Sequence, residues 1–159
     1  LGNFRADFAK AFLAQMAELV GEGGALLIGL DLQKDTETLE AAYNDKAGVT
    51  AAFNTNLLRR MNRELDADFD LDAFEHQAFY NEDDGRIESH IVSLRDQTVR
   101  VAGRAFSFAK GETIYTECSH KYTLQGFARI ASAAGFRVER VWTDEDRLFS
   151  VQYAVCVRS

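Results

Sequence analysis

A short, almost wholly apolar run follows directly on an amphipathic segment of helical length near the start of the chain. Residues 4–20 repeat apolar side chains at helical spacing, and residues 25–32 (ALLIGLDL) come after a glycine-rich turn. A helix that leads into a continuous apolar strand is typical of an α/β sheet with buried parallel strands. The sequence therefore predicts such a strand at 25–32. The helical stripe expected to face the core comprises Phe4, Phe8, Ala9, Phe12, Met16 and Leu19.

The glycine cluster between these two elements, Gly21, Gly23 and Gly24, superficially suggests a phosphate-binding loop. A dinucleotide fingerprint, however, follows a strand and opens a helix, whereas this cluster follows a helix and opens a strand. We therefore interpret it as a turn.

The middle of the chain predicts helices at 36–44 and 48–65, then an acidic connector at 66–72. The connector lacks the central glycine and terminal glutamate of a calcium loop, so a solvated turn that caps a short helix is favoured. The inner face expected for the longer helix comprises Phe53, Leu57, Leu58, Met61 and Leu65.

From residue 74 onward the pattern changes to short strands separated by polar turns. Thr123 and Gly135 then delimit a helix at 124–134, with Leu124, Phe127, Ile130 and Ala131 facing inward. The predicted strands are 75–81, 86–94, 98–102 and 113–122, expected to be antiparallel, and a final pair at 136–143 and 148–157.

This order predicts an α/β fold: the second half of a doubly wound sheet with a smaller antiparallel α+β unit inserted into it. The sheet part would comprise residues 1–35 and 123–159, and the insertion residues 36–122. Cofactors of such folds sit at the carboxyl ends of the first strands, so a nucleotide-like cofactor would bind mostly upstream of Leu1.

The strand at 113–122 carries the clearest candidate chemistry. Glu117 and Ser119 are two residues apart, so their side chains share one face of the strand. A carboxylate and a hydroxyl on one face can hold the two nitrogens of an imidazole ring. A strand whose outer face is simply solvated is the alternative.

Other candidate residues have structural alternatives. Asn3 could cap the first helix, and Tyr43 could be an ordinary half-buried tyrosine. Asp31, at the end of the apolar strand, could serve a ligand or cap a helix. The three histidines, which lack the spacing of a zinc site, are expected on the surface or on strand faces: His76, His90 and His120.

Composition excludes several classes of function. The net charge is −7 without a basic stripe, which disfavours nucleic-acid and anionic-membrane partners. Only Cys118 and Cys156 occur, and neither a membrane-length apolar run nor a leader is evident, so a cytoplasmic setting is expected. Because the chain opens abruptly with Leu1 rather than Met, we expect a fragment.

Four blocks of the sequence resemble the histidine-specific S-adenosylmethionine-dependent methyltransferases of ergothioneine biosynthesis. They are GNF at 2–4, AAYNDKAGVTAAFNTNLL at 41–58, NRELDADFDLDAFEH at 62–76 and TECSHKY at 116–122. The resemblance implies the C-terminal half of a class I (Rossmann-like) methyltransferase with an inserted substrate-binding domain. It also implies three methyl transfers from S-adenosyl-L-methionine to the α-amino group of L-histidine, which give trimethylhistidine (hercynine).

The resemblance also implies roles for five residues. Asn3 and Tyr43 would hold the carboxylate and amine of histidine, Phe53 would line the pocket, and Glu117 and Ser119 would hold the imidazole ring. Ser89 departs from the larger apolar residue expected after Arg86-Ile87-Glu88, which would loosen the pocket. No catalytic base and no metal ligand is assigned.

Two hypotheses follow. The chain is part of a histidine methyltransferase, inactive in isolation, or it is a non-catalytic α+β module that binds a small amino acid or imidazole compound. In either case an exposed sheet edge would favour pairing with a second copy.

Overall fold

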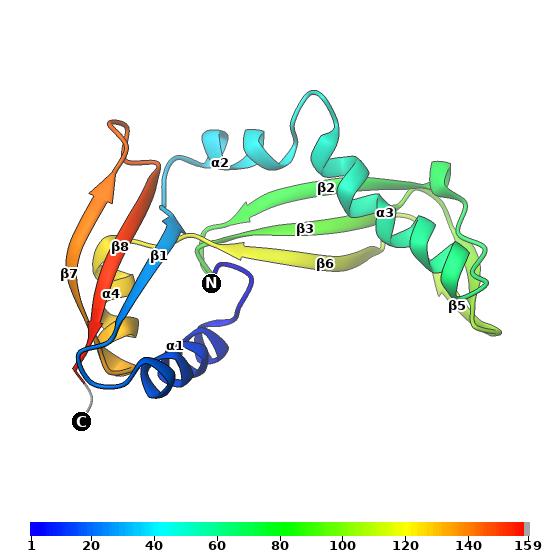
Figure 1. Cartoon of the computed structure of the whole chain (residues 1–159). Helices are drawn as coiled ribbons and strands as arrows, with labels where there is room; N and C mark the ends of the chain where they lie inside the picture. The colour runs from blue at the N-terminus through cyan, green and yellow to red at the C-terminus, as the bar shows by residue number, and fades with distance from the viewer. Residues whose placement is uncertain (158–159) are drawn as a thin grey trace. The chain divides into compact units, whose positions relative to one another are not determined.

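The computed structural model describes residues 1–157 (Figure 1). Residues 158 and 159, the last of the expected 123–159 segment, lie outside the described residues. The chain divides into two compact units. Unit 1 comprises residues 1–35, 82–86 and 118 onward, and unit 2 comprises residues 36–81 and 87–117.

The sheet of unit 1 has three strands in the order β1 (Ala25–Asp31), β8 (Phe149–Cys156) and β7 (Phe136–Thr143). β8 runs antiparallel to both neighbours, so the parallel ladder expected for 25–32 is wrong within the described residues. The single parallel contact of this segment is the isolated bridge between Leu32 and Tyr122. The final strand pair was predicted correctly, because its hairpin is local in sequence.

Helices α1 (Ala6–Val20) and α4 (Leu124–Ala133) belong to the same unit. α4 begins as predicted, because the Thr123 hydroxyl accepts a hydrogen bond from the Gly126 N–H at 2.9 Å. Phe127 and Ala131 are fully buried, as predicted. They join a core formed by Leu13, Ala17, Leu30, Tyr122, Phe127, Ala131, Ala134, Phe136, Ala154 and Cys156.

The buried stripe predicted for α1 is largely wrong, although its member Ala9 is fully buried. α1 packs through Ala9, Leu13 and Ala17, whereas Phe8 on another face is 63% exposed. Alanines at two of these three positions allow this helix to pack closely on α4, with which it is in contact. The exposed members of the predicted stripe are Phe4, Phe8, Phe12 and Leu19.

The glycine cluster is a turn, as interpreted. The N–H of Gly21 donates to the carbonyl of Ala17 and ends α1, with φ +71° at Gly21. A Cβ on Gly24 would lie 2.4 Å from the carbonyl oxygen of Val20, so only glycine fits there.

Unit 2 is built on a sheet in the order β2 (Phe74–Asn81), β3 (Arg86–Ser93) and β6 (Thr113–His120). The last three residues of β6 and the first of β3 belong to unit 1. β4 (Gln97–Val101) pairs antiparallel with a strand that the sequence did not predict, β5 (Arg104–Phe108). The acidic connector ends in a short 3₁₀ helix (Leu71–Ala73) capped by Asp70, in line with the sequence.

The helices of unit 2 are α2 (Thr36–Tyr43) and α3 (Val49–Glu64). α3 buries Asn54 and Leu58 but leaves Phe53 72% exposed, so its predicted inner face is largely wrong. Leu57 and Leu65 are exposed as well. The main core of this unit comprises Leu58, Phe69, Ala73, Phe74, Ile91 and Val99.

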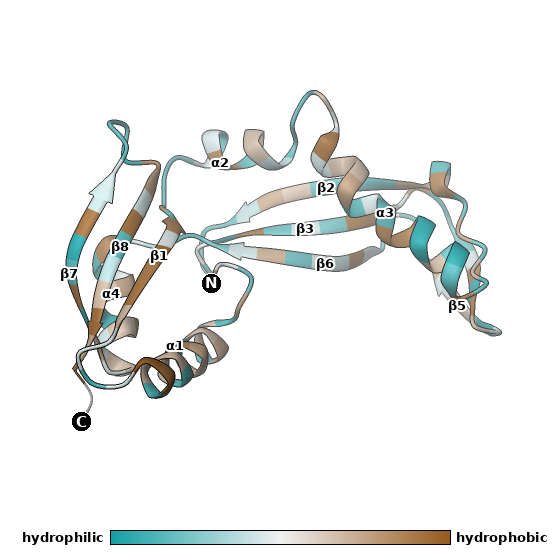
Figure 2. Cartoon of the chain, viewed as in Figure 1, coloured by the Kyte–Doolittle hydropathy of each residue, from teal (hydrophilic) through white to brown (hydrophobic). Residues whose placement is uncertain are grey.

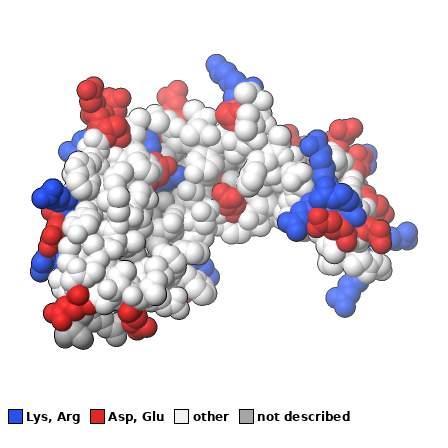
Figure 3. Space-filling view, viewed as in Figure 1, with Lys and Arg blue, Asp and Glu red and all other residues white. Residues whose placement is uncertain are grey.

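One face of the unit 1 sheet is apolar and open to solvent in this chain. Figure 2 shows hydrophobic residues along β1, β7 and β8, and in Figure 3 charged groups lie mainly at the margin of this surface. Leu27 is 64% exposed, and Trp142 and Phe149 are each about half exposed. Apolar faces of α/β sheets are ordinarily covered by helices.

No helix among residues 1–157 is both long and apolar enough to cross a membrane.

Truncating Phe127 to alanine tests whether the packing of α4 stabilises unit 1. Because Phe127 is fully buried, Phe127→Ala should lower the free energy of unfolding by about 3–5 kcal/mol. Phe8→Ala, the same truncation at an exposed site of the unit, should change it by less than about 0.5 kcal/mol. Urea unfolding of both variants makes the comparison, and equal losses would contradict the packing described.

Candidate functional site

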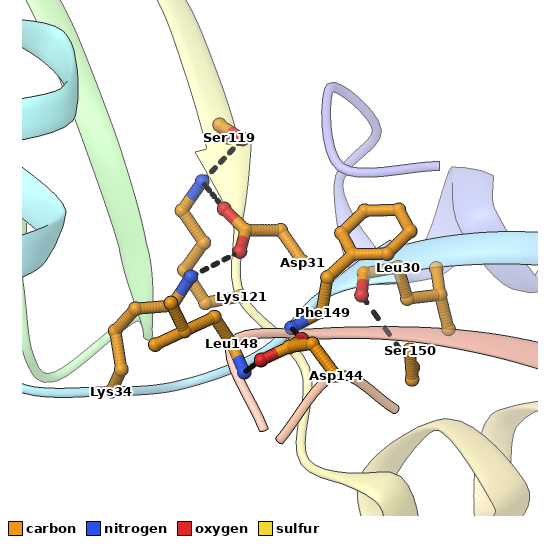
Figure 4. A network of polar contacts seen from close by, with 9 residues as sticks. All are labelled: Leu30, Asp31, Lys34, Ser119, Lys121, Asp144, Leu148, Phe149 and Ser150. Carbon is orange, nitrogen blue, oxygen red and sulfur yellow. Dashed lines mark hydrogen bonds and ion pairs between the residues drawn. The ribbon is translucent and has the colours of Figure 1, made fainter. Parts of the chain in front are cut away.

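A buried ammonium group lies at the end of β6 in unit 1 (Figure 4). The side chain of Lys121 is fully buried, and its Nζ lies 2.8 Å from Oδ2 of Asp31. Oδ1 of the same aspartate lies 2.6 Å from Nζ of Lys34. Asp31 therefore binds two lysines. No capping contact of its side chain occurs among the described residues, so the ion pair replaces the capping role considered for it.

Backbone hydrogen bonds place Asp31 opposite Lys121. The N–H of Tyr122 donates to the carbonyl of Asp31 at 3.0 Å, and the N–H of Gln33 donates to the carbonyl of Tyr122 at 3.0 Å. The N–H of Lys121 donates to the carbonyl of Gly85 at 2.8 Å. The ion pair is therefore held by main-chain contacts on either side.

The ion pairs shift the protonation of Asp31. Burial raises its pKa, but hydrogen bonds and charge interactions with Lys121 and Lys34 outweigh this and hold the pKa below its ordinary value. The carboxylate therefore stays ionised at neutral pH and neutralises the buried ammonium.

Lys121 also orients Ser119. Its Nζ lies 2.9 Å from Oγ of Ser119, two residues back along the chain and on the same face (Figure 4). An ammonium can only donate hydrogen bonds, so Oγ of Ser119 is the acceptor in this contact. The hydroxyl proton of Ser119 must consequently point elsewhere.

Asn3 lies against the same strand end. Its Nδ2 donates to the carbonyl of Cys118 at 3.0 Å, and the N–H of His120 donates to the carbonyl of Gly2 at 2.8 Å. Asn3 is not a helix cap: α1 has Arg5 at its N-cap, and no side chain caps it. Unit 1 thus brings Asn3 close to Ser119, two predicted site residues far apart in sequence.

Glu117 belongs to the part of β6 that lies in unit 2. It is half-buried, and among residues 1–157 its carboxylate has no hydrogen-bond or ion-pair partner. A half-buried carboxylate without a protein partner is costly to retain, and it is a ready acceptor for a ligand N–H.

The other predicted residues of unit 2 have distinct surroundings. Tyr43 is half-buried and packs against the small core of Leu39, Ala78 and Ile87. Phe53 lies on α3, and its high exposure leaves the ring free of core packing.

Sequence reasoning missed a polar network around the buried Asn54. Nδ2 of Asn54 donates to the carbonyl of His90 at 3.0 Å and lies 2.9 Å from Nδ1 of His76. Nδ1 of His76 therefore accepts, and its Nε2 donates to the carbonyl of Tyr43 at 2.9 Å. This chain of contacts fixes the end of α2, where Tyr43 lies.

The histidines lie on strands, as expected. His90 stacks on Phe79, with ring centroids 5.2 Å apart, and lies 5.1 Å from the ring of Tyr115. Nε2 of His90 is 3.3 Å from the Glu88 carboxylate.

Unit 1 has two pockets beside the end of β6. One, of about 200 Å³, is lined by residues that include Phe4, His120 and Lys121. The other, of about 410 Å³, is lined by residues that include Lys34 and Arg147. Neither holds a glycine-rich turn between a strand and a helix, and the glycine cluster at 21–24 serves a helix-to-strand turn.

The family model of histidine-specific, S-adenosylmethionine-dependent methyltransferases matches residues 1–156. The chain belongs to this family. It is 45% identical over 157 residues to the histidine N-alpha-methyltransferase of Mycolicibacterium smegmatis and 41% identical over 156 residues to that of Mycobacterium tuberculosis. The alignments cover 98% and 97% of this chain, and 49% of each relative.

The chain thus spans about half the length of these family members. Among solved structures, it is similar to the CcbJ methyltransferase from Streptomyces caelestis, with a TM-score of 0.49 and 11% identity. That match covers 99% of this chain and 53% of the other.

Lys121 and its partner Asp31 are the residues of this site that sequence reasoning missed. The available signal was the position of Lys121, two residues beyond Ser119 on the same strand face. Nothing local could show that Asp31, 90 residues away, supplies the counter-charge.

The lowered pKa of Asp31 predicts a pH-dependent contribution to stability. A depressed pKa contributes stability that is fully present above the unfolded value near 3.8 and is lost as the pH falls through the folded value. Asp31→Asn should therefore be less stable than wild type at pH 7, by roughly 1–3 kcal/mol, with the difference shrinking below about pH 4.

Chemical unfolding at a series of pH values measures this difference. Glu22→Gln, at an exposed carboxylate of the same unit, serves as the control and should follow the wild-type curve. A wild-type–Asp31→Asn difference that does not change with pH would contradict an ionised Asp31.

Proposed function

We propose that this chain is the substrate-binding C-terminal half of a methyltransferase that methylates the α-amino group of L-histidine three times, to hercynine. Its family membership supports the reaction class. The observation that carries the choice of substrate is the half-buried Glu117 carboxylate, which lacks a partner among residues 1–157 and lies two residues from Ser119 on one strand.

These two groups suit an imidazole ring. The Glu117 carboxylate accepts a hydrogen bond from a ring N–H, and the Ser119 hydroxyl binds the second ring nitrogen. An indole or phenyl ring would leave at least one of these polar groups without a partner, which costs roughly 1–3 kcal/mol. This cost favours histidine over other aromatic amino acids.

Asn3 and Tyr43 bind the amino-acid end of the substrate in this proposal. Both offer uncharged hydrogen-bonding groups, which hold the amine without fixing it as a cation. Methyl transfer needs the neutral lone pair of that amine, so neutral partners suit the reaction better than a carboxylate would. Phe53, whose ring has no place in the core, lines the pocket.

The domain assignment belongs to the same proposal. Residues 1–35 and 123–159 form the second part of a class I (Rossmann-like) methyltransferase sheet, and residues 36–122 form the inserted substrate-binding domain. S-adenosyl-L-methionine supplies an activated methyl group from a site formed mainly by polypeptide upstream of Leu1. The chain's own residues bind and orient the substrate.

The open apolar face of the unit 1 sheet supports this arrangement. Leu27, Trp142 and Phe149 expose hydrophobic surface that an α/β fold normally buries under helices. Polypeptide corresponding to the half of the relatives that this chain does not span would supply the covering layer.

Substitution of Glu117 tests the substrate assignment in a protein of the relatives' length that contains this chain. Glu117→Ala should weaken histidine binding by about 10- to 100-fold and leave S-adenosylhomocysteine binding within about 2-fold, because only the ring loses a charged acceptor. Isothermal titration calorimetry, with and without S-adenosylhomocysteine, measures both affinities.

Glu75→Ala, at an exposed carboxylate on β2, is the matched control and should bind both ligands normally. Equal losses of both ligands in Glu117→Ala would assign Glu117 to the fold instead.

The 159-residue chain by itself should self-associate through its open sheet edge and apolar face. Sedimentation should give a mass above the 17.8 kDa of one chain. Leu27→Lys, which places a charge on that face, should shift the equilibrium toward monomer, whereas Val49→Lys on α3 of unit 2 should not. A monomeric wild-type chain would contradict the expectation.

A further inference from the structure

We propose that Lys121 is a positioning residue that fixes the hydrogen-bonding direction of Ser119, so that the site binds neutral imidazole in a single tautomer. This inference rests on the proposed function, because it concerns how Ser119 meets the substrate ring.

Lys121 limits the hydrogen bonds that the Ser119 hydroxyl can form. A serine hydroxyl can donate one hydrogen bond and accept two. Nζ of Lys121, at 2.9 Å, occupies an acceptor position of the Ser119 oxygen and cannot itself accept the hydroxyl proton. The proton of Ser119 is therefore available for a ligand, and the ligand atom that receives it must be an acceptor.

The surroundings of Lys121 hold its ammonium group against Ser119. The Lys121 side chain is fully buried, and its charge is balanced by Asp31 at 2.8 Å. The main-chain bond from Tyr122 to Asp31 keeps the two groups opposite each other. Lys121 cannot turn toward solvent without leaving its carboxylate partner Asp31, so its contact with Ser119 is formed before a ligand arrives.

The imidazole ring of the substrate must match the hydrogen-bonding groups of Glu117 and Ser119. A neutral imidazole has one protonated nitrogen, which donates, and one unprotonated nitrogen, which accepts. Glu117 is an acceptor, and the contact with Lys121 leaves the Ser119 proton free to donate. The protonated nitrogen therefore faces Glu117, and the unprotonated nitrogen faces Ser119. An imidazolium, which has two donors and no acceptor, offers nothing to receive the Ser119 proton.

The test is ¹⁵N NMR of ring-labelled histidine bound to a protein of the relatives' length that contains this chain. Free histidine exchanges its ring proton rapidly, and its nitrogen signals are averaged. Bound to wild type, it should give one signal typical of a protonated nitrogen and one typical of an unprotonated nitrogen. In Lys121→Met the two signals should move together, and histidine affinity should fall about 10-fold.

Lys34→Met is the matched control. Lys34 also pairs with Asp31, at 2.6 Å, but Ser119 is not among its hydrogen-bond partners in the described chain. This variant should keep both separate signals and an affinity within about 2-fold of wild type. A loss equal to that of Lys121→Met would mean that charge balance at Asp31, and not the orientation of Ser119, matters.

A double-mutant cycle separates positioning from folding. If Lys121 acts through Ser119, then Lys121→Met should have little further effect on affinity in a Ser119→Ala background. Additive losses, or unchanged NMR signals in Lys121→Met, would overturn the proposal. If Lys121→Met does not fold, Lys121→Gln, which retains a donor toward Asp31, replaces it in the cycle. A wild-type protein that binds S-adenosylhomocysteine but not histidine would refute the proposed function itself.

Discussion

The ion pair between Asp31 and Lys121 is the contact on which the candidate site depends. A fully buried ammonium is tolerated only beside a counter-charge, and Asp31 at the end of β1 supplies one. The pair therefore joins the end of β1 to the residues that follow β6. The bridge between Leu32 and Tyr122 makes the same connection through the main chain. Ser119, two residues before Lys121, takes its orientation from this junction.

The fold provides two kinds of polar group for a ligand. Lys121 occupies one acceptor position of Ser119, so the hydroxyl proton is free to donate to a ligand. Glu117 is half-buried without a partner among the described residues, so its acceptor capacity is unused. A free donor and an unused acceptor on one strand face are complementary to a ring with one of each. Hydrogen bonds to a preorganised site cost less ordering than bonds to mobile side chains.

Much of the fold follows from local sequence signals. Thr123 caps α4, and the spacing of Phe127 and Ala131 identifies its buried face, because one amphipathic face and one cap are both readable from a short window. The sequence analysis did not predict β5. In the structure, Ala102 and Gly103 adopt positive φ angles and form the two-residue hairpin turn between β4 and β5. Alternation is weak there, because residues 104–107 of β5 are all exposed.

The errors at α1 and α3 have a common physical cause. Both helices carry apolar residues on more than one face, and periodicity alone does not show which face meets the core. In α1 the face with Ala9 and Ala17 is buried against the core, because small side chains allow close helix–helix packing. Phe8, on another face, stays exposed although it is far more hydrophobic. The candidate site was partly predictable because Glu117 and Ser119 share a strand. Lys121 was not, since its role depends on a partner distant in sequence.

The polar contacts around Ser119 and the open apolar face of the sheet are two separate features of unit 1. The contacts that orient Ser119 lie within unit 1: Lys121, its partner Asp31 and the main-chain bonds around them. The apolar sheet face, in contrast, lacks a covering layer in this chain. In the proposed enzyme, recognition of the imidazole end is therefore built into this half, whereas the donor of the methyl group requires the other. The same proposal assigns substrate selectivity to this half and makes the catalytic rate depend on its union with the other.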